Sequence, residues 1–259
     1  MSILLLLLYA IYSYSMQRSA VLLRRGFAAA AGASAGKRIA VVLSGSGVYD
    51  GTEITEAVSA LIHLTGAAAR VAMFAPDKTQ MHTVNHLTGE DMGEERNVLV
   101  ESARIARGAV SGLGGLDVDD FDALVVPGGF GAAKNLSSFA VDGPEMTVDD
   151  DVARIVRGFH SAGKPIGLCC IAPTLAAKLI PGCEVTVGMS AGEEGVWPHQ
   201  GAAGGCEAMG ATHKDTDIDG FHVDNANKLV TSCAYMKEGT ASEVHTNVGQ
   251  MIAGVLALA

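Results

Sequence analysis

The sequence predicts an α/β protein whose mostly parallel sheet is covered by helices on both faces. Short apolar runs alternate along the chain with stretches in which apolar residues recur at helical spacing. The apolar runs are nearly continuous, which is typical of parallel strands buried on both faces. Glycine is frequent, at 32 of 259 residues, while aromatic residues make up only 5%. This balance favours many tight turns between strands and helices over an aromatic-rich β-sandwich.

The first half of the folded region begins this alternation. Strands are predicted at 38–44, 71–75 and 123–126, and helices at 54–66 and 97–107. Pro76 is expected to end the second strand, and Gly66 to end the first helix. Glu101 lies one helical turn before Arg104, which favours an ion pair. The polar connection 77–95 is long, so we predict a functional or capping loop that shields the site.

The second half continues in the same way. Strands are predicted at 165–168, 184–187 and 229–232, and helices at 148–160, 172–179 and 241–258. In open parallel sheets, ligands bind outside the carboxyl ends of the strands. The loops after Ser44, Val126 and Leu168 should therefore converge, and all three contain unusual residue patterns.

Residues 1–36 have the composition of an organelle targeting sequence. No acidic residue occurs before Asp50, whereas Arg18, Arg24 and Arg25 are interleaved with Ser, Ala and Leu. An arginine-rich, acid-free segment is typical of a transit peptide. We therefore predict that residues 1–36 are a mitochondrial transit peptide and linker, and that the protein acts in the matrix.

The apolar run 3–8 leaves two alternatives open. It resembles the core of a secretion signal, but no positive charge precedes it. It is also much shorter than the roughly 20 apolar residues that cross a bilayer, so we expect no stable membrane anchor. Secretion, or a tail with no sorting role, remains the alternative, and Met16 is a second possible start. The folded domain is predicted at 37–259.

Charge and cysteine content exclude several classes of function. The net charge is −10, with 28 acidic and 18 basic residues, so we do not expect nucleic acid to be a partner. The five cysteines include no Cys-x-x-Cys pair, which argues against a disulfide framework and a structural zinc site. We expect reduced thiols in an intracellular compartment and no bound metal.

A cysteine pair follows the predicted strand 165–168. Cys169 and Cys170 are followed almost at once by a helix, with Pro173 in its first turn. This order predicts a strand–nucleophile–helix elbow, with Cys169 in the sheet packing and Cys170 in the turn. A thiol at a helix N-terminus is expected to ionise readily. Two inert, buried structural cysteines are the alternative.

The loop after the first strand leads into a helix with two early carboxylates. Gly45 and Gly47 form only a Gly-x-Gly pair, which is weak evidence for a nucleotide site. Glu53 and Glu56 lie where the helix dipole stabilises negative charge. One of them could hydrogen-bond the thiol and set its ionisation. Simple capping, with Thr52 as the N-cap, is the alternative.

The loop after the third strand contains Pro127-Gly128-Gly129. Two glycines allow the backbone to approach a ligand closely. Their N–H groups, with that of Ile171, could donate to an oxyanion beside the cysteine. The alternative is a tight turn that only requires a positive φ.

Together these segments resemble the ThiJ/PfpI superfamily, relatives of class I glutamine amidotransferases, and within it the ElbB-like subgroup. The resemblance covers nearly all of 38–258. It rests on the segments LSG and VYDG at 43–51, FAPD at 74–77, NVL and SARIARG at 97–108, PGGFGAAKNL at 127–136, and GKP and CIAP at 163–173.

The resemblance implies a flavodoxin-like fold, often dimeric, so we expect a homodimer. It implies Cys170 as the nucleophile and Glu56 as the carboxylate that touches the thiol, with Glu53 second. It places Gly129 and Ile171 at the oxyanion-donor positions, beside Gly128. Mitochondrial members also have acid-free leaders.

The position after the nucleophile departs from part of the superfamily. Some members have a histidine there, where this chain has Ile171. A general base would then come from a later loop. The candidates are His199, His213, His222 and His245, and His213 is preferred because it follows Gly210-Ala211-Thr212 near a strand start. Without such a base, amide hydrolysis is difficult, because the leaving amine needs a proton.

Three functions remain open at this point. Related proteins act on methylglyoxal or glyoxal without a cofactor, so the first is a glyoxalase- or deglycase-like enzyme with a small carbonyl substrate. The second is a non-catalytic redox sensor or protective protein that uses a low-pKa thiol. The third is an amidotransferase-like hydrolase that needs a partner protein.

Overall fold

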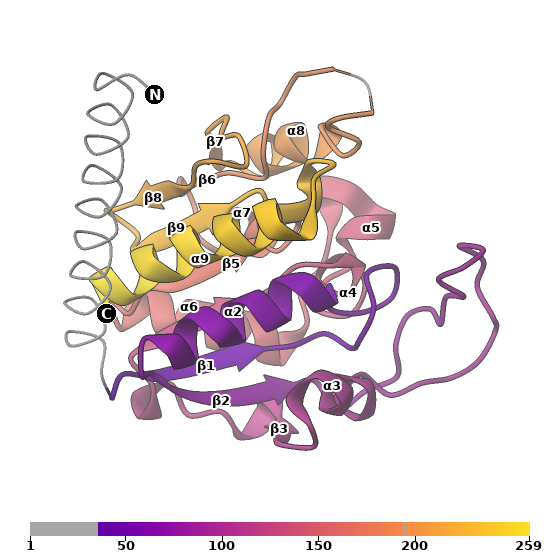
Figure 1. Cartoon of the computed structure of the whole chain (residues 1–259), viewed down its shortest axis with the longest axis horizontal. Helices are drawn as coiled ribbons and strands as arrows, with labels where there is room; N and C mark the ends of the chain where they lie inside the picture. Colours follow the sequence, from indigo (N-terminus) through magenta and orange to yellow (C-terminus); the bar gives the residue numbers. More distant parts are fainter. Residues whose placement is uncertain (1–35, 194) are drawn as a thin grey trace, which may run out of the picture.

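A computed structural model describes residues 36–193 and 195–259. The predicted transit peptide lies outside these residues, apart from Gly36. The described residues form a seven-stranded sheet in the order β3-β2-β1-β4-β5-β9-β8, flanked by helices (Figure 1). Neighbouring strands are parallel except β8 and β9. The predicted α/β, flavodoxin-like architecture is confirmed.

The sheet is built from short apolar strands. They are β1 (Arg38–Val42), β2 (Arg70–Ala75), β3 (Val110–Gly112), β4 (Ala123–Val126), β5 (Ile166–Cys169), β8 (His222–Asp224) and β9 (Leu229–Ser232). The central strands β4, β5 and β9 are buried along their whole length. The predicted strand at 184–187 is shorter, because β6 (Glu184–Val185) pairs only with β7 (Thr212–His213) in a separate small sheet.

Helices cover both faces of the sheet. They are α2 (Ile54–Gly66), α3 (Val98–Ala106), α4 (Phe130–Lys134), α5 (Phe139–Asp142), α6 (Asp150–Ser161), α7 (Pro173–Leu179), α8 (Gly201–Ala208) and α9 (Ala241–Leu258). Short 3-10 turns span Leu113–Gly115, Val118–Asp120, Gly143–Glu145 and Ala234–Met236. Helices α2 and α9 lie side by side on one face, and α6 packs on β4 and β5 from the other (Figure 1).

Helix α2 buries a different side from the one that its apolar spacing suggests. Its small residues Ala57 and Ala60 face the core, whereas Ile54, Val58 and Ile62 are 49%, 41% and 52% exposed. Close packing of α2 against α9 accounts for the preference for small side chains at the contact. Part of the helical apolar stripe therefore faces outward.

The long connection 77–95 projects from the body of the molecule beyond β2 and α3 (Figure 1). The backbone N–H of Val84 donates to Asp50 (2.7 Å), and that of Tyr49 donates to Nε2 of His86 (3.1 Å). The segment therefore braces the loop after β1. The prediction that it shields the cysteine pocket is not supported, since none of its residues lines that pocket.

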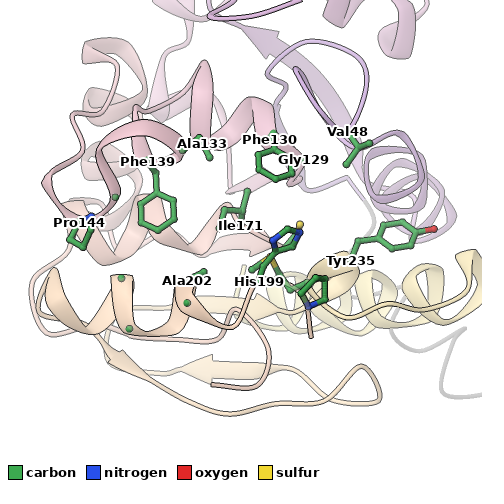
Figure 2. Close-up of a pocket in the computed structure, with 18 residues that line it drawn as sticks. Val48, Gly129, Phe130, Ala133, Phe139, Pro144, Ile171, His199, Ala202 and Tyr235 are labelled. Carbon is green, nitrogen blue, oxygen red and sulfur yellow. The ribbon is translucent and has the colours of Figure 1, made fainter. Parts of the chain in front are cut away.

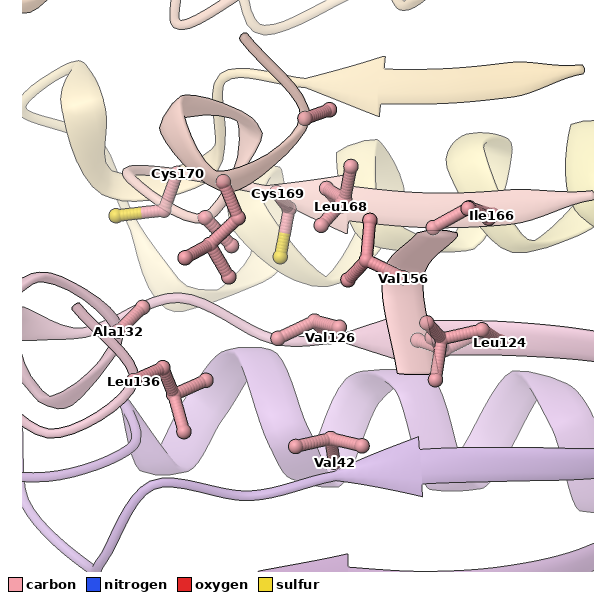
Figure 3. Packing of buried hydrophobic residues seen from close by; sticks show 14 of the residues in the cluster. Val42, Leu124, Val126, Ala132, Leu136, Val156, Ile166, Leu168, Cys169 and Cys170 are labelled. Carbon is pink, nitrogen blue, oxygen red and sulfur yellow. The ribbon is translucent and has the colours of Figure 1, made fainter. Parts of the chain in front are cut away.

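Gly167 allows α9 to approach the sheet. A Cβ atom at this position would lie 2.5 Å from Cγ2 of Val255 and 2.7 Å from Sδ of Met251. Figure 3 shows buried side chains of the neighbouring strands β4 and β5, among them Leu124, Val126, Ile166 and Leu168. Because this core is closely packed, α9 cannot accommodate even one added methyl without moving.

We therefore expect Gly167→Ala to lower the free energy of unfolding by about 1–3 kcal/mol, the usual cost of overpacking. Urea unfolding monitored by circular dichroism measures this change. Gly66→Ala is the matched control, because a Cβ there meets no atom within 4 Å. Equal stabilities of the two variants would contradict this view of the α9 contact.

Candidate active site

Cys170 occupies a strained turn immediately after β5. Its φ is +60°, in the left-handed region, which costs a residue with a side chain about 1 kcal/mol or more. Its N–H donates to the carbonyl of Ser232 (3.0 Å). Cys169 ends the strand and is fully buried, while Cys170 is 7% exposed. The two side chains point in different directions (Figure 3), as expected for an elbow.

Glu56 lies in the first turn of α2 and is fully buried. Its Oε2 accepts a hydrogen bond from the N–H of Gly128 (2.9 Å), and its Oε1 accepts one from the N–H of Tyr235 (3.3 Å). Sγ of Cys169 donates a hydrogen bond to Oε2 (3.7 Å), and the thiol of Cys170 and the carboxyl lie close enough to shift each other's pKa. The structure thus brings Glu56 against both thiols.

Burial is the main cause of a raised pKa at Glu56. Desolvation, with the charge of nearby Glu53, raises the pKa from 4.5 to about 8, and the hydrogen bonds from Tyr235, Cys170 and Gly128 only partly oppose it. At neutral pH the carboxyl therefore holds a proton. A neutral carboxyl can donate that proton to a sulfur anion.

Glu53 has a different position from Glu56. It is the N-cap of α2, where its Oε2 accepts from the N–H of Glu56 (2.7 Å). Its own N–H donates to the carbonyl of Gly128 (3.0 Å). Thr52, the alternative cap, instead accepts from the N–H of Ser44 (2.7 Å). Glu53 does not line the pocket beside Cys170, so it orders the helix start and acts on Glu56 through its charge.

Gly128 and Gly129 are required by close contacts. A Cβ at Gly128 would lie 2.4 Å from Cβ of Cys170 and 2.8 Å from Oε2 of Glu56. Gly129 has a φ of +93°, and a Cβ there would meet the backbone of Glu53 at 2.3 Å. Any side chain at these positions would push the thiol and the carboxyl apart.

The thiol of Cys170 is harder to ionise than the sequence suggests. Burial raises its pKa well above 9.0, and the negative charge of Glu56 raises it further. The N–H groups of Gly129 and Ile171 act in the opposite direction and favour the thiolate. The expectation of a low-pKa thiol is therefore wrong. The thiolate is favoured when Glu56 is protonated, because two adjacent buried anions repel each other.

Cys170 opens into a cavity of about 510 Å³. Figure 2 shows Phe130, Phe139, Ile171 and His199 around this space. The cavity extends from the cysteine to helix α8, and most of its lining is apolar.

Of the four candidate histidines, only His199 lines this cavity. His213 lies in β7, where Nε2 accepts from the N–H of Val187 (3.2 Å) and Nδ1 faces Asp215. His222 pairs with Glu184, and His245 stacks on His63. The structure does not bring His213, the preferred candidate, to the cysteine.

His199 is positioned by the loop between β6 and α8. Trp197, two residues earlier, is only 6% exposed and packs against Gly188 and Gly192. The tryptophan therefore anchors the segment that leads into α8. The ring of Phe130 meets His199 edge-on, with centroids 5.7 Å apart.

Within residues 36–193 and 195–259, no group of three or more His, Cys, Asp or Glu side chains is arranged to hold a metal ion. No helix in the same ranges is long and apolar enough to cross a bilayer.

Glu56 is expected to make stability depend on pH. Its pKa is higher in the folded protein, about 8, than its ordinary value of 4.5, so its protonated form stabilises the fold. This contribution is complete below pH 4.5 and is lost as pH rises toward 8. Between pH 5 and 8, the stability of the wild type relative to Glu56→Gln should fall by up to about 1.4 kcal/mol per pH unit. Urea unfolding at several pH values measures the difference, and parallel curves would contradict the raised pKa.

The same substitution should make Cys170 more reactive. Glu56→Gln removes a negative charge beside the thiol, so the pKa of Cys170 should fall. The rate of iodoacetamide alkylation at Cys170, followed by peptide mass spectrometry across pH 6–11, should show a lower midpoint in the variant. An unchanged or higher midpoint would show that the carboxylate does not control the thiol.

No family model matches the chain. It is 53% identical over 222 residues to the mitochondrial glutamine amidotransferase-like class 1 domain-containing protein 3 of Homo sapiens, covering 85% of this chain and 83% of that protein. It is 39% identical over 208 residues to the mitochondrial ES1 protein of Danio rerio, covering 77% of each.

Solved structures agree with these relatives. An Ehrlichia chaffeensis isoprenoid biosynthesis protein with an amidotransferase-like domain has a TM-score of 0.78 and 35% identity, covering 86% of this chain and 99% of that one. Glyoxalase III from Candida albicans shares the fold, with a TM-score of 0.54 and 15% identity over 84% of this chain and 97% of that one.

The names of the curated relatives confirm the predicted mitochondrial location. Their identity and coverage confirm the resemblance that the sequence motifs showed. The chain belongs to the glutamine amidotransferase-like class 1 domain-containing (ES1) family.

Proposed function

We propose that this protein is a cofactor-free, thiol-dependent enzyme of the glyoxalase or deglycase type that acts on reactive dicarbonyls in mitochondria. The observation that supports this most strongly is the arrangement around Cys170. A strained thiol opens into a cavity, with a protonatable carboxyl and two N–H groups acting on its sulfur. We also propose residues 1–36 as a removable leader, residues 37–259 as the domain, and a homodimer as its assembled form.

The first step is addition of Cys170 to the aldehyde carbon. The sulfur–carbon bond forms, the C=O π electrons move to oxygen, and the thiol proton passes by way of Glu56 to that oxygen. The product is a hemithioacetal. The N–H groups of Gly129 and Ile171 lie beside the sulfur and are suited to hold the developing negative charge on oxygen.

The second step moves a hydrogen between neighbouring carbons. A base removes the proton from the hemithioacetal carbon, and the hydroxyl on that carbon gives up its proton as the new C=O forms. The adjacent ketone gains one proton on carbon and one on oxygen, which leaves a thioester of a 2-hydroxy acid. Water then hydrolyses the thioester and restores the thiol. One carbon is oxidised and its neighbour reduced, so no external oxidant is needed. His199, in the cavity wall, is our candidate for a proton carrier in place of His213.

The other two functions receive less support from the site. A redox sensor needs an exposed, easily ionised thiol, but Cys170 is 7% exposed and its pKa is raised. Amide hydrolysis needs an acid for the leaving amine. An aldehyde has no leaving group in the addition step, so a thiol and one carboxyl are sufficient to begin.

We expect purified protein to convert methylglyoxal to lactate, and Cys170→Ala to reduce kcat/KM by about 10³-fold or more. Cys183→Ala is the matched control, because that thiol is also free and buried but does not line the cavity, and this variant should retain most activity. Enzymatic assay of lactate measures both. Equal rates for the wild type and Cys170→Ala would refute the proposed reaction for this substrate.

A further inference from the structure

We propose that the cavity beside Cys170 selects 2-oxoaldehydes with an uncharged aryl or extended alkyl group, in preference to methylglyoxal and to substrates that contain an amino acid. This inference rests on the proposed function and adds the substrate class. It is argued from the size of the cavity, the chemistry of its walls and the open space along α8.

The cavity is much larger than a three-carbon aldehyde requires. Its volume of about 510 Å³ lies within the range of roughly 300–1,000 Å³ that is typical of sites for drug-sized ligands. Methylglyoxal bound at Cys170 would leave most of this space empty or filled with water. A substrate with a longer apolar group would displace that water.

The walls are apolar. Phe130, Phe139, Ile171 and Met236 contribute most of the large side chains. Tyr235 also lines the space, but its hydroxyl points away from Phe139 and Ala202 (Figure 2). His199 is the only histidine among the described residues that line the cavity. An aryl or alkyl group of a substrate in this cavity would contact apolar side chains on most sides.

No Asp, Glu, Lys or Arg among the described residues lines the cavity. Lys134 is near, but its Nζ donates to the carbonyl of Tyr49 and lies 5.4 Å from the ring centroid of Phe130, itself part of the wall. Glutamine and glycated amino acids contain an ammonium and a carboxylate group. Burying these charges without partners is strongly unfavourable, so the cavity selects against both.

The wall formed by α8 leaves room for a substrate. Its sequence begins Gly201-Ala202-Ala203-Gly204-Gly205, although each glycine costs a helix about 1 kcal/mol relative to alanine. A Cβ at Gly201 or Gly204 would meet no atom within 4 Å, whereas one at Gly205 would lie 2.9 Å from Phe139. Two of these glycines therefore face open space.

The test measures kcat/KM for methylglyoxal, for straight-chain 2-oxoaldehydes of increasing length, and for phenylglyoxal, after subtraction of the Cys170→Ala background. Each added methylene should raise kcat/KM about fourfold, which corresponds to about 0.8 kcal/mol, until the cavity is filled. If methylglyoxal is turned over but kcat/KM stays constant or falls as the chain lengthens, the substrate class is overturned and the proposed function remains intact. No Cys170-dependent turnover of any aldehyde would refute the function itself, and the inference with it.

Cavity-filling variants test whether the apolar group of the substrate binds in this cavity. Gly204→Leu on α8 and Ala140→Leu on α5, both in the lining, should each lower the ratio of kcat/KM for phenylglyoxal over methylglyoxal about tenfold. Two positions are used so that a folding defect in one does not decide the result, and circular dichroism verifies folding. Gly66→Leu is the control, because position 66 is also open but lies at the far end of α2. An unchanged ratio in both filled variants would place the apolar group elsewhere and overturn the inference.

Discussion

The buried carboxyl of Glu56 is the interaction on which the arrangement of the site depends. It receives the N–H of Gly128 from the loop after β4 and the N–H of Tyr235 from the loop after β9, and it contacts the two thiols at the end of β5. A buried polar group must be hydrogen-bonded, so these loops are held at one point. The cavity beside Cys170 exists because the carboxyl ends of the central strands meet there.

The same contact limits the chemistry that the thiol can perform. Burial and the neighbouring carboxylate both oppose a free thiolate at Cys170, so at neutral pH the thiol and Glu56 each keep a proton instead of ionising together. Such a pair is suited to a reaction in which the proton is handed to the substrate as sulfur attacks. An aldehyde accepts that proton directly on oxygen. The mostly apolar cavity then determines which aldehyde reaches the sulfur.

Much of the fold was predictable from the sequence, because buried parallel strands leave nearly continuous apolar runs. The elbow at Cys170 and the carboxyl at Glu56 also follow from local patterns. Helix α8 does not, because its glycines have a low helix propensity and are explained by the cavity that they border. The pKa of Cys170 depends on burial, and the position of His199 in the cavity wall depends on the packing of distant segments around Trp197. Neither is encoded in the local spacing of residues.

The protonation state of Glu56 tests this account most directly. Infrared difference spectra between the wild type and Glu56→Gln, recorded from pH 5 to 10, isolate the C=O stretch of this one carboxyl in its protonated form. We expect the band to be present at neutral pH and to disappear with a midpoint of about 8. A band that is already absent at pH 6 would show an ordinary, ionised carboxylate. It would contradict the protonated carboxyl at the centre of the site.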